Sequence, residues 1–251
     1  MNVVALRGVS FAYNGSRIVD DLTFGVEAGA FVGLVGPNGA GKTTILRLLQ
    51  GLLRPSAGTV ELEGRDLSTF HRNEIALRIA GVWQRPPLAF GFTARELVLL
   101  GRTPHLGVMK WETPKDLEIV DDVMRQTETL HLAGRTAMQM SAGELQRVFI
   151  ASALAQRSRI LLLDEPTSFL DLRQAARLSK IIGELMQCGM TIVCASHDLA
   201  LIRRHASKVV VIRAGRMHYE GAPDDALDRV RLAEAFGMQQ EDWYHDEGND
   251  K

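Results

Sequence analysis

Short, mostly apolar stretches recur at four places along the chain. They are AFVGLV (30–35), RILLLDEP (159–166), MTIVCAS (190–196) and KVVVIRAG (208–215). A stretch of this length without polar alternation is typical of a β-strand that is buried on both faces of a sheet. Helical periodicity follows the first stretch in TTILRLLQGLL (43–53) and separates the second from the third in LRQAARLSKIIGELMQ (172–187). This order of strands and helices predicts an α/β fold with a parallel sheet that helices cover on both faces.

Two other patterns surround these strands. About the first 30 residues alternate loosely between apolar and polar positions and are broken by Asn-Gly and Ala-Gly, which predicts short antiparallel strands. GTVELEG (58–64) and IAGVWQ (79–84) also have strand patterns. From about Thr93 to Ala155 the pattern is almost wholly helical, with a Pro/Gly break at GRTPHLG. We therefore expect a helical block inserted into the α/β unit.

Composition narrows the class of protein. The 251 residues, 46% of them hydrophobic, suffice for one domain of generous size. Lys and Arg total 29 and Asp and Glu total 30, and the net charge of -1 disfavours nucleic acid as a partner. No apolar run approaches the ~18 residues of a membrane span, and the N-terminus lacks the features of a signal peptide. We expect a cytoplasmic chain with Cys188 and Cys194 as buried thiols, unless another component holds it at a membrane.

The most specific motif is GPNGAGKT (36–43), which fits G-x-x-x-x-G-K-[ST] after a buried strand and before a helix. In such a loop, glycines let backbone N–H groups turn toward phosphates, Lys42 reaches the outer phosphates and the Thr43 hydroxyl is a Mg²⁺ ligand. The sequence therefore predicts a phosphate cradle. Its expected members are Gly36, Pro37, Asn38, Gly39, Ala40, Gly41, Lys42, Thr43 and Thr44.

A pair of acids, Asp164 and Glu165, ends the strand ILLLD. Carboxylates at this end of a strand lie at the edge of an open α/β sheet where ligands bind. Beside a phosphate cradle, we expect Asp164 to hold Mg²⁺, mostly through water, and Glu165 to polarise an attacking water as general base.

Three other polar features follow strands or open helices. Gln84 could reach the Mg²⁺ or the water, and His197 by itself is more often a polar cap than a catalytic group. MSAGELQR (140–147) places Ser141 and two small residues at the start of a helix, an arrangement that suits an anion. The chain thus has two candidate anion cradles.

Taken in order, these motifs resemble the ATP-binding cassette subunits of ABC transporters over about residues 3–222. The matching pieces are Tyr13 as the aromatic that would stack on adenine, the loop at 36–43, Gln84, SAGE (Ser141, Ala142, Gly143, Glu144) as the signature, LLLDEP, SFLD (168–171, ending at Asp171) as the loop crossing to a partner subunit, and the switch His197. The resemblance implies an ATPase that uses ATP and Mg²⁺.

The resemblance also implies the architecture. We expect a RecA-like P-loop NTPase core with an N-terminal antiparallel β-subdomain, formed by residues 1–86 and 156–222. The helical subdomain would occupy 87–155, and a C-terminal helix with a polar tail 223–251.

In the family that the chain resembles, two copies face each other head to tail. The segment Ser141–Gly143 of one copy closes on the γ-phosphate held by the other, so a homodimer is implied. The usual signature has Gly-Gly after the serine, whereas Ala142 stands here. Alanine would cost about 1 kcal/mol if that position needs φ > 0 and nothing at a helical φ. We expect the site to work.

The stretch RPPLAFGFTARELVLLGRTPHLG (85–107) resembles the subclass that serves importers of iron–siderophore, haem and cobalamin complexes. That resemblance implies docking of an integral-membrane permease near 85–107 and a peripheral place on the cytoplasmic face of the membrane. A substrate-binding protein outside the membrane would be an indirect partner.

Other assignments stay open from the sequence. A soluble ATPase of the same family that drives a scaffold, as in iron–sulfur cluster assembly, has this length and these motifs, and a subunit serving another cargo is a further alternative. An SMC-type ATPase would need a long coiled coil, for which no sustained heptads are present. A plain P-loop kinase would not explain the signature, SFLD and His197 together.

Overall fold

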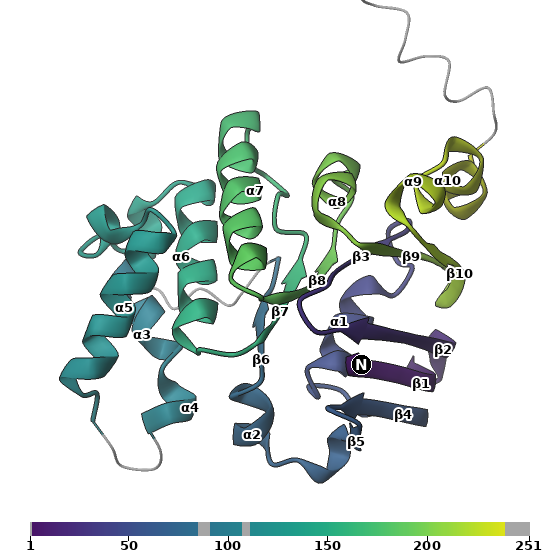
Figure 1. The fold of residues 1–251 in the computed structure, drawn as a ribbon, viewed down its shortest axis with the longest axis horizontal. Coiled ribbons are helices and arrows are strands. Elements are labelled where there is room, and N and C mark those ends of the chain that lie inside the picture. The colour runs from purple at the N-terminus through teal and green to yellow at the C-terminus, as the bar shows by residue number, and fades with distance from the viewer. Residues whose placement is uncertain (1, 85–90, 107–110, 239–251) are drawn as a thin grey trace, which may run out of the picture.

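The computed structural model describes residues 2–84, 91–106 and 111–238 (Figure 1). Its main sheet has six strands in the order β10-β9-β3-β8-β7-β6, all parallel except β10. Their bounds are β3 (Phe31–Val35), β6 (Ile79–Val82), β7 (Ile160–Asp164), β8 (Thr191–Ala195), β9 (Lys208–Arg213) and β10 (Arg216–Gly221). The predicted α/β class with a parallel sheet is confirmed.

The apolar stretches are strands that are buried on both faces. Every residue of β3, β7 and β8 is buried. Within β3, Val32 and Leu34 pack in one hydrophobic core, whereas Phe31 and Val35 pack in the other. Because successive side chains of a strand point to opposite faces, the inner positions of a strand between two cores are apolar, and the polar residues Asp164 and Thr191 stand at strand ends.

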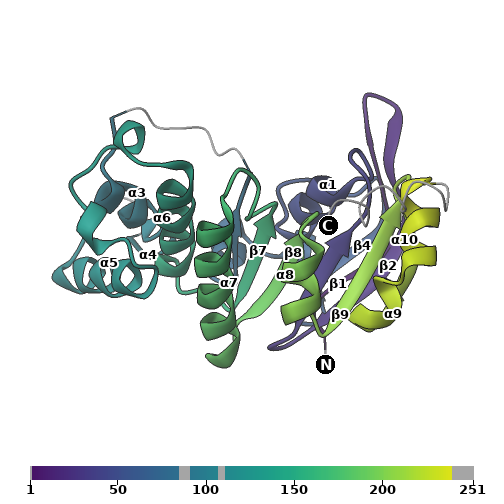
Figure 2. The ribbon, with the colours of Figure 1, turned by 90° about the horizontal axis from the view of Figure 1, so that it is seen from above.

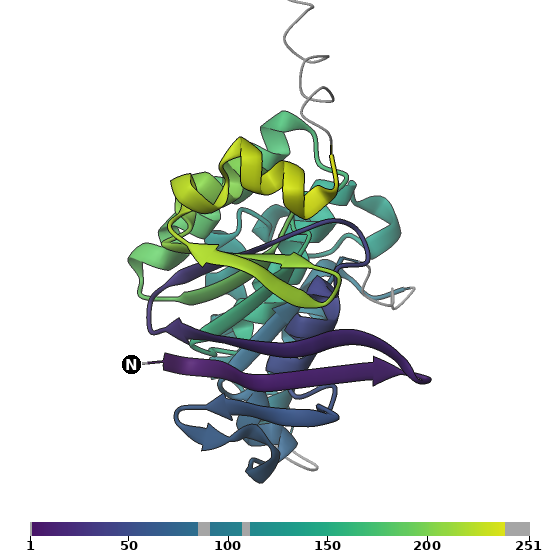
Figure 3. The same cartoon turned by 90° about the vertical axis from the view of Figure 1, so that its right-hand side faces the viewer.

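A second, antiparallel sheet has the strand order β2-β1-β4-β5. Its strands are β1 (Asn2–Tyr13), β2 (Ser16–Glu27), β4 (Ala57–Leu62) and β5 (Arg65–Asp66). The expectation of short strands was wrong for β1 and β2, which have 12 residues each and run side by side (Figure 3). Register shifts within β1 let one strand continue where the loose alternation suggested breaks.

The helices form layers on both sides of the main sheet. α1 (Lys42–Leu49) packs between the two sheets, where Ile45 and Leu49 join the core shared by both. α7 (Leu172–Gln187) and α8 (Leu199–His205) contribute to the core on the opposite face. Figures 1 and 2 show the helical block on one side of α7 and the antiparallel sheet on the other. The helices of the helical block are α3 (Ala94–Leu100), α4 (Thr103–Leu106), α5 (Pro114–Gln126) and α6 (Ala142–Ala155).

The remaining elements are short. They are the 3₁₀ turns η1 (Leu67–Thr69), η2 (Leu130–Leu132) and η3 (Ala137–Gln139), and the helices α2 (Arg72–Ala76), α9 (Pro223–Ala226) and α10 (Arg229–Phe236). No helix among the described residues is both long and apolar enough to cross a membrane. The subdomain boundaries at 86/87, 155/156 and 222/223 stay predictions. The polar tail from 239 and parts of the stretch 85–107, namely 85–90 and 107, lie outside the described residues.

The two cysteines differ in environment. Cys194 is fully buried in β8, as expected, and burial raises the pKa of its thiol well above the ordinary value. The prediction of a buried thiol was wrong for Cys188, which is exposed. It follows the last residue of α7 as the helix cap, directly before Gly189 with a φ of 81°, so the chain has already turned toward solvent.

A buried ion pair ties α5 to the turn between α3 and α4. Arg102 Nε donates to Asp116 Oδ1 at 2.9 Å, and both side chains are under 10% exposed. The hydroxyl and backbone N–H of Thr113 donate to the other carboxylate oxygen, at 2.6 and 2.9 Å. These Thr113 hydrogen bonds, together with Arg102, lower the pKa of Asp116 to about 2. Since the folded-state pKa is depressed, the stabilisation is present above the ordinary pKa of 3.8 and is lost as the pH falls toward 2.

Asp116→Asn should therefore lower the free energy of unfolding by about 2 kcal/mol at neutral pH, because it leaves the Arg102 guanidinium buried without its counter-ion. The difference from wild type should shrink as the pH approaches 2. Urea denaturation across this pH range measures both effects. Asp122→Asn on the same helix is the control, since its pair with Arg125 is about 60% exposed and its loss should cost under about 0.5 kcal/mol. Equal losses for the two variants would contradict the assignment.

Candidate functional site

The loop between β3 and α1 forms the predicted phosphate cradle. Gly36 lies so close to β9 that a Cβ there would meet the Ile212 carbonyl oxygen at 2.1 Å. Gly41 has a φ of 100°, a conformation that side chains rarely adopt, and its added Cβ would lie 2.9 Å from the Ile18 carbonyl oxygen. Only glycine fits at these two positions, and the loop delivers Lys42 as the first residue of α1.

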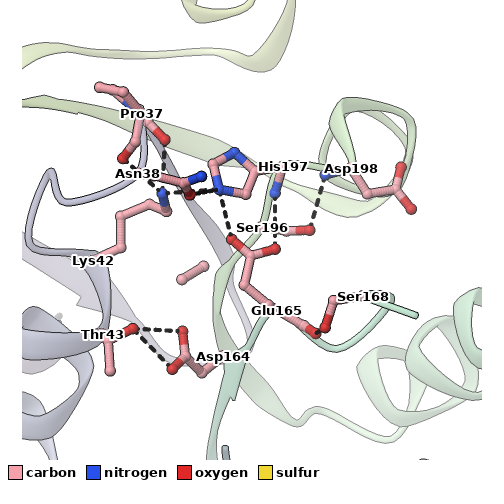
Figure 4. Close-up of polar contacts among 12 residues, drawn as sticks. Pro37, Asn38, Lys42, Thr43, Asp164, Glu165, Ser168, Ser196, His197 and Asp198 are labelled. Atoms are coloured by element: carbon pink, nitrogen blue, oxygen red, sulfur yellow. Dashed lines mark hydrogen bonds and ion pairs between the residues drawn. The ribbon is translucent and has the colours of Figure 1, made fainter. Parts of the chain in front are cut away.

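Lys42 carries a buried positive charge (Figure 4). Its Nζ donates to the carbonyl oxygens of Gly36, at 2.7 Å, and Pro37, at 3.1 Å, and lies 3.4 Å from Nε2 of His197. Burial lowers the pKa of Lys42, against the opposite effect of the Glu165 and Asp164 carboxylates. The ammonium is therefore poorly hydrated and suited to meeting an anion.

The carboxylate of Asp164 is held by the next residue of the cradle. Thr43 Oγ1 lies 2.9 Å from Asp164 Oδ2 and 3.1 Å from Oδ1, and donates to the carboxylate. Burial at the end of β7 raises the pKa of Asp164, against the Thr43 hydrogen bond. A hydroxyl and a carboxylate are oxygen ligands of the kind that Mg²⁺ takes, and Gln84 borders the same cavity. No cluster of three or more His, Cys, Asp or Glu side chains in the described ranges could hold a metal by itself, so phosphate or water oxygens would complete the shell.

Glu165 has a constrained backbone and a free acceptor atom. Its φ of 50° is left-handed, which is costly for a residue with a side chain. Oε2 accepts the backbone N–H of His197 at 3.2 Å. Oε1 of Glu165 is buried and accepts no hydrogen bond from the described residues. His197 Nε2 lies 3.2 Å from Oε1, but this nitrogen is directed to Asn38 Oδ1 at 2.9 Å. Burial raises the pKa of Glu165, against the effect of His197.

These groups line one cavity of about 790 Å³. The predicted residues that border it are Tyr13, Asn38, Gly39, Ala40, Gly41, Lys42, Thr43, Thr44, Gln84, Asp164, Glu165 and His197. Tyr13, at the tip of the β1–β2 hairpin, stands against Phe11 in an edge-to-face contact. The cavity thus has an aromatic side chain, a phosphate-type loop and two carboxylates on its walls, which suits a nucleotide.

The signature residues are not part of this cavity. Ser141, Ala142, Gly143, Glu144 and Asp171 do not line it, although all are described. Ser141 is the N-cap of α6: its Oγ accepts the Glu144 N–H, and the Glu144 carboxylate accepts the Ser141 N–H at 2.8 Å. Ala142 is the first residue of that helix and does not have a positive φ. Alanine at this position therefore carries no backbone penalty.

The motifs of the sequence did not indicate the apolar rim of the site. Leu172 is 91% exposed and lines the cavity, and Phe169, in the loop before it, is also mostly exposed. Asp171 caps α7 by accepting the Gln174 N–H, which turns Leu172 outward at the first helical position. The sequence signal that could have revealed this rim is Leu172, a leucine on the polar face of the amphipathic helix α7. Exposed large apolar side chains grouped near a site indicate a surface that another molecule covers.

The family model described as ABC transporter matches residues 19–168. The cobalamin import ATP-binding protein of Halobacterium salinarum is 40% identical over 231 residues, which cover 91% of this chain but only 58% of that protein. The hemin import ATP-binding protein of Myxococcus xanthus is 37% identical, with 93% of this chain and 90% of that protein covered. A solved structure described as a metal-chelate type ABC transporter in an inward-facing conformation superposes with a TM-score of 0.83 at 26% identity, covering 94% of this chain and 90% of that one.

Lys42→Ala should raise the dissociation constant for ATP at least about a hundredfold, because it removes the buried cation that meets the phosphates. Titration calorimetry with the wild-type chain and the variant measures the change. Lys180→Ala is the control, since that side chain is 70% exposed on α7 and does not line the cavity. Equal ATP affinity for Lys42→Ala and wild type would remove Lys42 from the phosphate site.

Proposed function

The chain belongs to the ABC transporter family, and from this premise we propose that it is the ATP-binding and ATP-hydrolysing subunit of an importer for a metal chelate. The observation that carries the hydrolytic part is the buried, unpartnered Oε1 of Glu165 beside Lys42 and the Thr43–Asp164 pair. The import part is supported by the relatives that are named for cobalamin and hemin. The cargo class would be iron–siderophore, haem or cobalamin complexes.

ATP would lie along the cavity from Tyr13 to the loop at 36–43. Tyr13 offers a ring face for adenine, and the N–H groups of the loop and of the first turn of α1 surround the phosphates. Lys42 would pair with the outer phosphates. Mg²⁺, held by Thr43, by Gln84 and through water by Asp164, would neutralise phosphate charge.

Glu165 would act as the general base. A carboxylate oxygen that accepts no hydrogen bond from the described residues can accept a proton from a water placed against the terminal phosphate, and its raised pKa makes it a stronger base than an exposed glutamate. His197 would position this group, because its backbone N–H binds Oε2 and its ring is held by Asn38. The positive φ directs the carboxylate into the cavity immediately after β7 ends.

A second copy would complete each site. Ser141 and Ala142 are exposed at the start of α6 and Gly143 is buried, and none of them lines the chain's own cavity, so they would serve a nucleotide held by another copy. In a head-to-tail homodimer they would close on the γ-phosphate of the partner, with Glu144 keeping the Ser141 cap in place and Asp171 in the loop that crosses to the partner. The exposed Leu172 and Phe169 would be covered in that dimer.

An integral-membrane permease would dock near residues 85–107, holding the chain as a peripheral protein on the cytoplasmic face of the membrane. In the described part of this stretch Leu100 is 49% exposed and borders a small groove of about 190 Å³ that Trp83 and Phe149 also line. A substrate-binding protein would act on the permease from the other side.

Glu165→Gln should bind ATP and lose at least about a hundredfold in turnover, because an amide cannot take the proton. In the wild-type chain, burial raises the pKa of Glu165 above 4.5, so turnover should fall as the pH drops through a midpoint above that value. Steady-state ATPase rates at saturating Mg-ATP between about pH 5 and 8 test both expectations. Glu184→Gln, on the exposed side of α7, should behave as wild type. Turnover of Glu165→Gln within tenfold of wild type would exclude the base assignment.

Affinity purification from gently solubilised native membranes, with Glu165→Gln in ATP, should recover a polytopic membrane protein in about equal amount. Leu100→Glu should lose that partner while it keeps the ATPase rate of the free chain, because it places a charge on the docking groove only. Recovery of a soluble partner alone would favour the scaffold ATPase over the importer.

A further inference from the structure

The motif GRTPH (101–105), assigned above to permease docking, contacts the carboxyl end of α6 through its buried Arg102 and its exposed His105. Gly101 is buried, and a Cβ there would meet the backbone oxygen of Ser152 at 2.0 Å. The Ser152 hydroxyl in turn donates to the carbonyl oxygen of Leu97 at 2.8 Å. α3 and α6 thus touch at backbone distance, where only glycine fits.

The two basic residues of the motif satisfy the last carbonyls of α6. Arg102 Nη1 donates to Ala155 O at 2.6 Å, and His105 Nε2 donates to Gln156 O at 2.8 Å. The last four carbonyls of a helix lack intrahelical partners and form the negative end of its dipole, so a buried guanidinium and an imidazole N–H are matched to them. Asp116 fixes the Arg102 guanidinium from α5.

The same helix carries the signature at its other end. α6 begins directly after Ser141 and has 14 residues, so its two ends lie about 21 Å apart. At its carboxyl end the Gln156 side chain donates to Ile79 O, at 2.9 Å, and to Ala76 O, which joins the helix to the chain before and within β6. The carboxyl end of α6 is thus tied to the GRTPH motif and to β6, at the opposite end of the helix from the signature.

We propose that Gly101, Arg102 and His105 form a clamp that sets the position of Ser141–Gly143 by holding the carboxyl end of α6. They are positioning residues and do not touch nucleotide, because none of them lines the cavity. The proposal rests on the proposed function. Leu100 and Gly101 both line the groove on the outside, and Gly101, Arg102 and His105 connect that surface to the helix of the signature.

His105→Ala tests the clamp without disturbing the buried Arg102–Asp116 pair, whereas Gly101→Ala could fail to fold. Its kcat for ATP should fall about fivefold to tenfold, because the signature no longer closes in register on the partner's phosphate. The dissociation constant for ATP, measured on single protomers, should stay within twofold of wild type. His105→Gln supplies an N–H donor of similar reach and should restore kcat.

His131→Ala is the matched control, since His131 is exposed on η2 in the same helical block and no side-chain hydrogen bond of it occurs among the described residues. An unchanged kcat for His105→Ala, or a loss that His105→Gln does not restore, would overturn the clamp. Parallel losses in ATP affinity and kcat would also overturn it, because they indicate general damage to the fold. A wild-type chain without ATPase activity would instead count against the proposed function.

Discussion

The ammonium of Lys42 is the charge on which the nucleotide site depends. Asp164 and Glu165 are both removed from water, which raises their pKa values, and the buried cation between the loop and these acids opposes that effect. The buried Lys42 ammonium is stabilised because two backbone carbonyl oxygens accept hydrogen bonds from it. The balance requires β3 and β7 to end at the same edge of the sheet, which their parallel pairing through β8 provides. The six-stranded sheet therefore positions the groups of the site and also forms the centre of the fold.

The protein divides its polar groups between two surfaces. One cavity holds the phosphate loop, the acids and His197, while the signature serine opens a helix that points elsewhere. Each surface alone has an incomplete set of groups for hydrolysis. The helical block connects them, because α6 carries the signature at one end and meets the GRTPH motif and β6 at the other. The proposed dimeric ATPase, coupled to a membrane partner, would account for both surfaces and for the exposed Leu172.

Much of the core could be predicted from short-range patterns. The strands around Leu34, Leu162 and Val193 have no polar residue except at their ends, and Gly36 and Gly41 stand where the loop before Lys42 admits only glycine. The helical pattern of α7 ends at Gln187, and Gly189 is a typical residue just after a helix, so the exposed position of Cys188 was open to prediction. Contacts between distant segments, by contrast, could not be predicted this way. The pairing of β1 with both β2 and β4 depends on register shifts. The contact of the exposed His105 with the Gln156 carbonyl oxygen depends on the end of a helix that begins 37 residues later, so a motif that resembles a docking element could also hold that helix.

The left-handed backbone of Glu165 has a consequence for how the protein can be improved. A glutamate at a φ of 50° costs the native state about 1 kcal/mol relative to glycine, and asparagine also adopts this conformation more readily. Its carboxylate is also buried without a full set of hydrogen bonds. Screens of random variants for thermal stability would therefore enrich replacements at this position, and if Glu165 is the proposed general base, those stabilised variants would lack ATPase activity. Any programme of thermal improvement has to be scored on turnover from its first round.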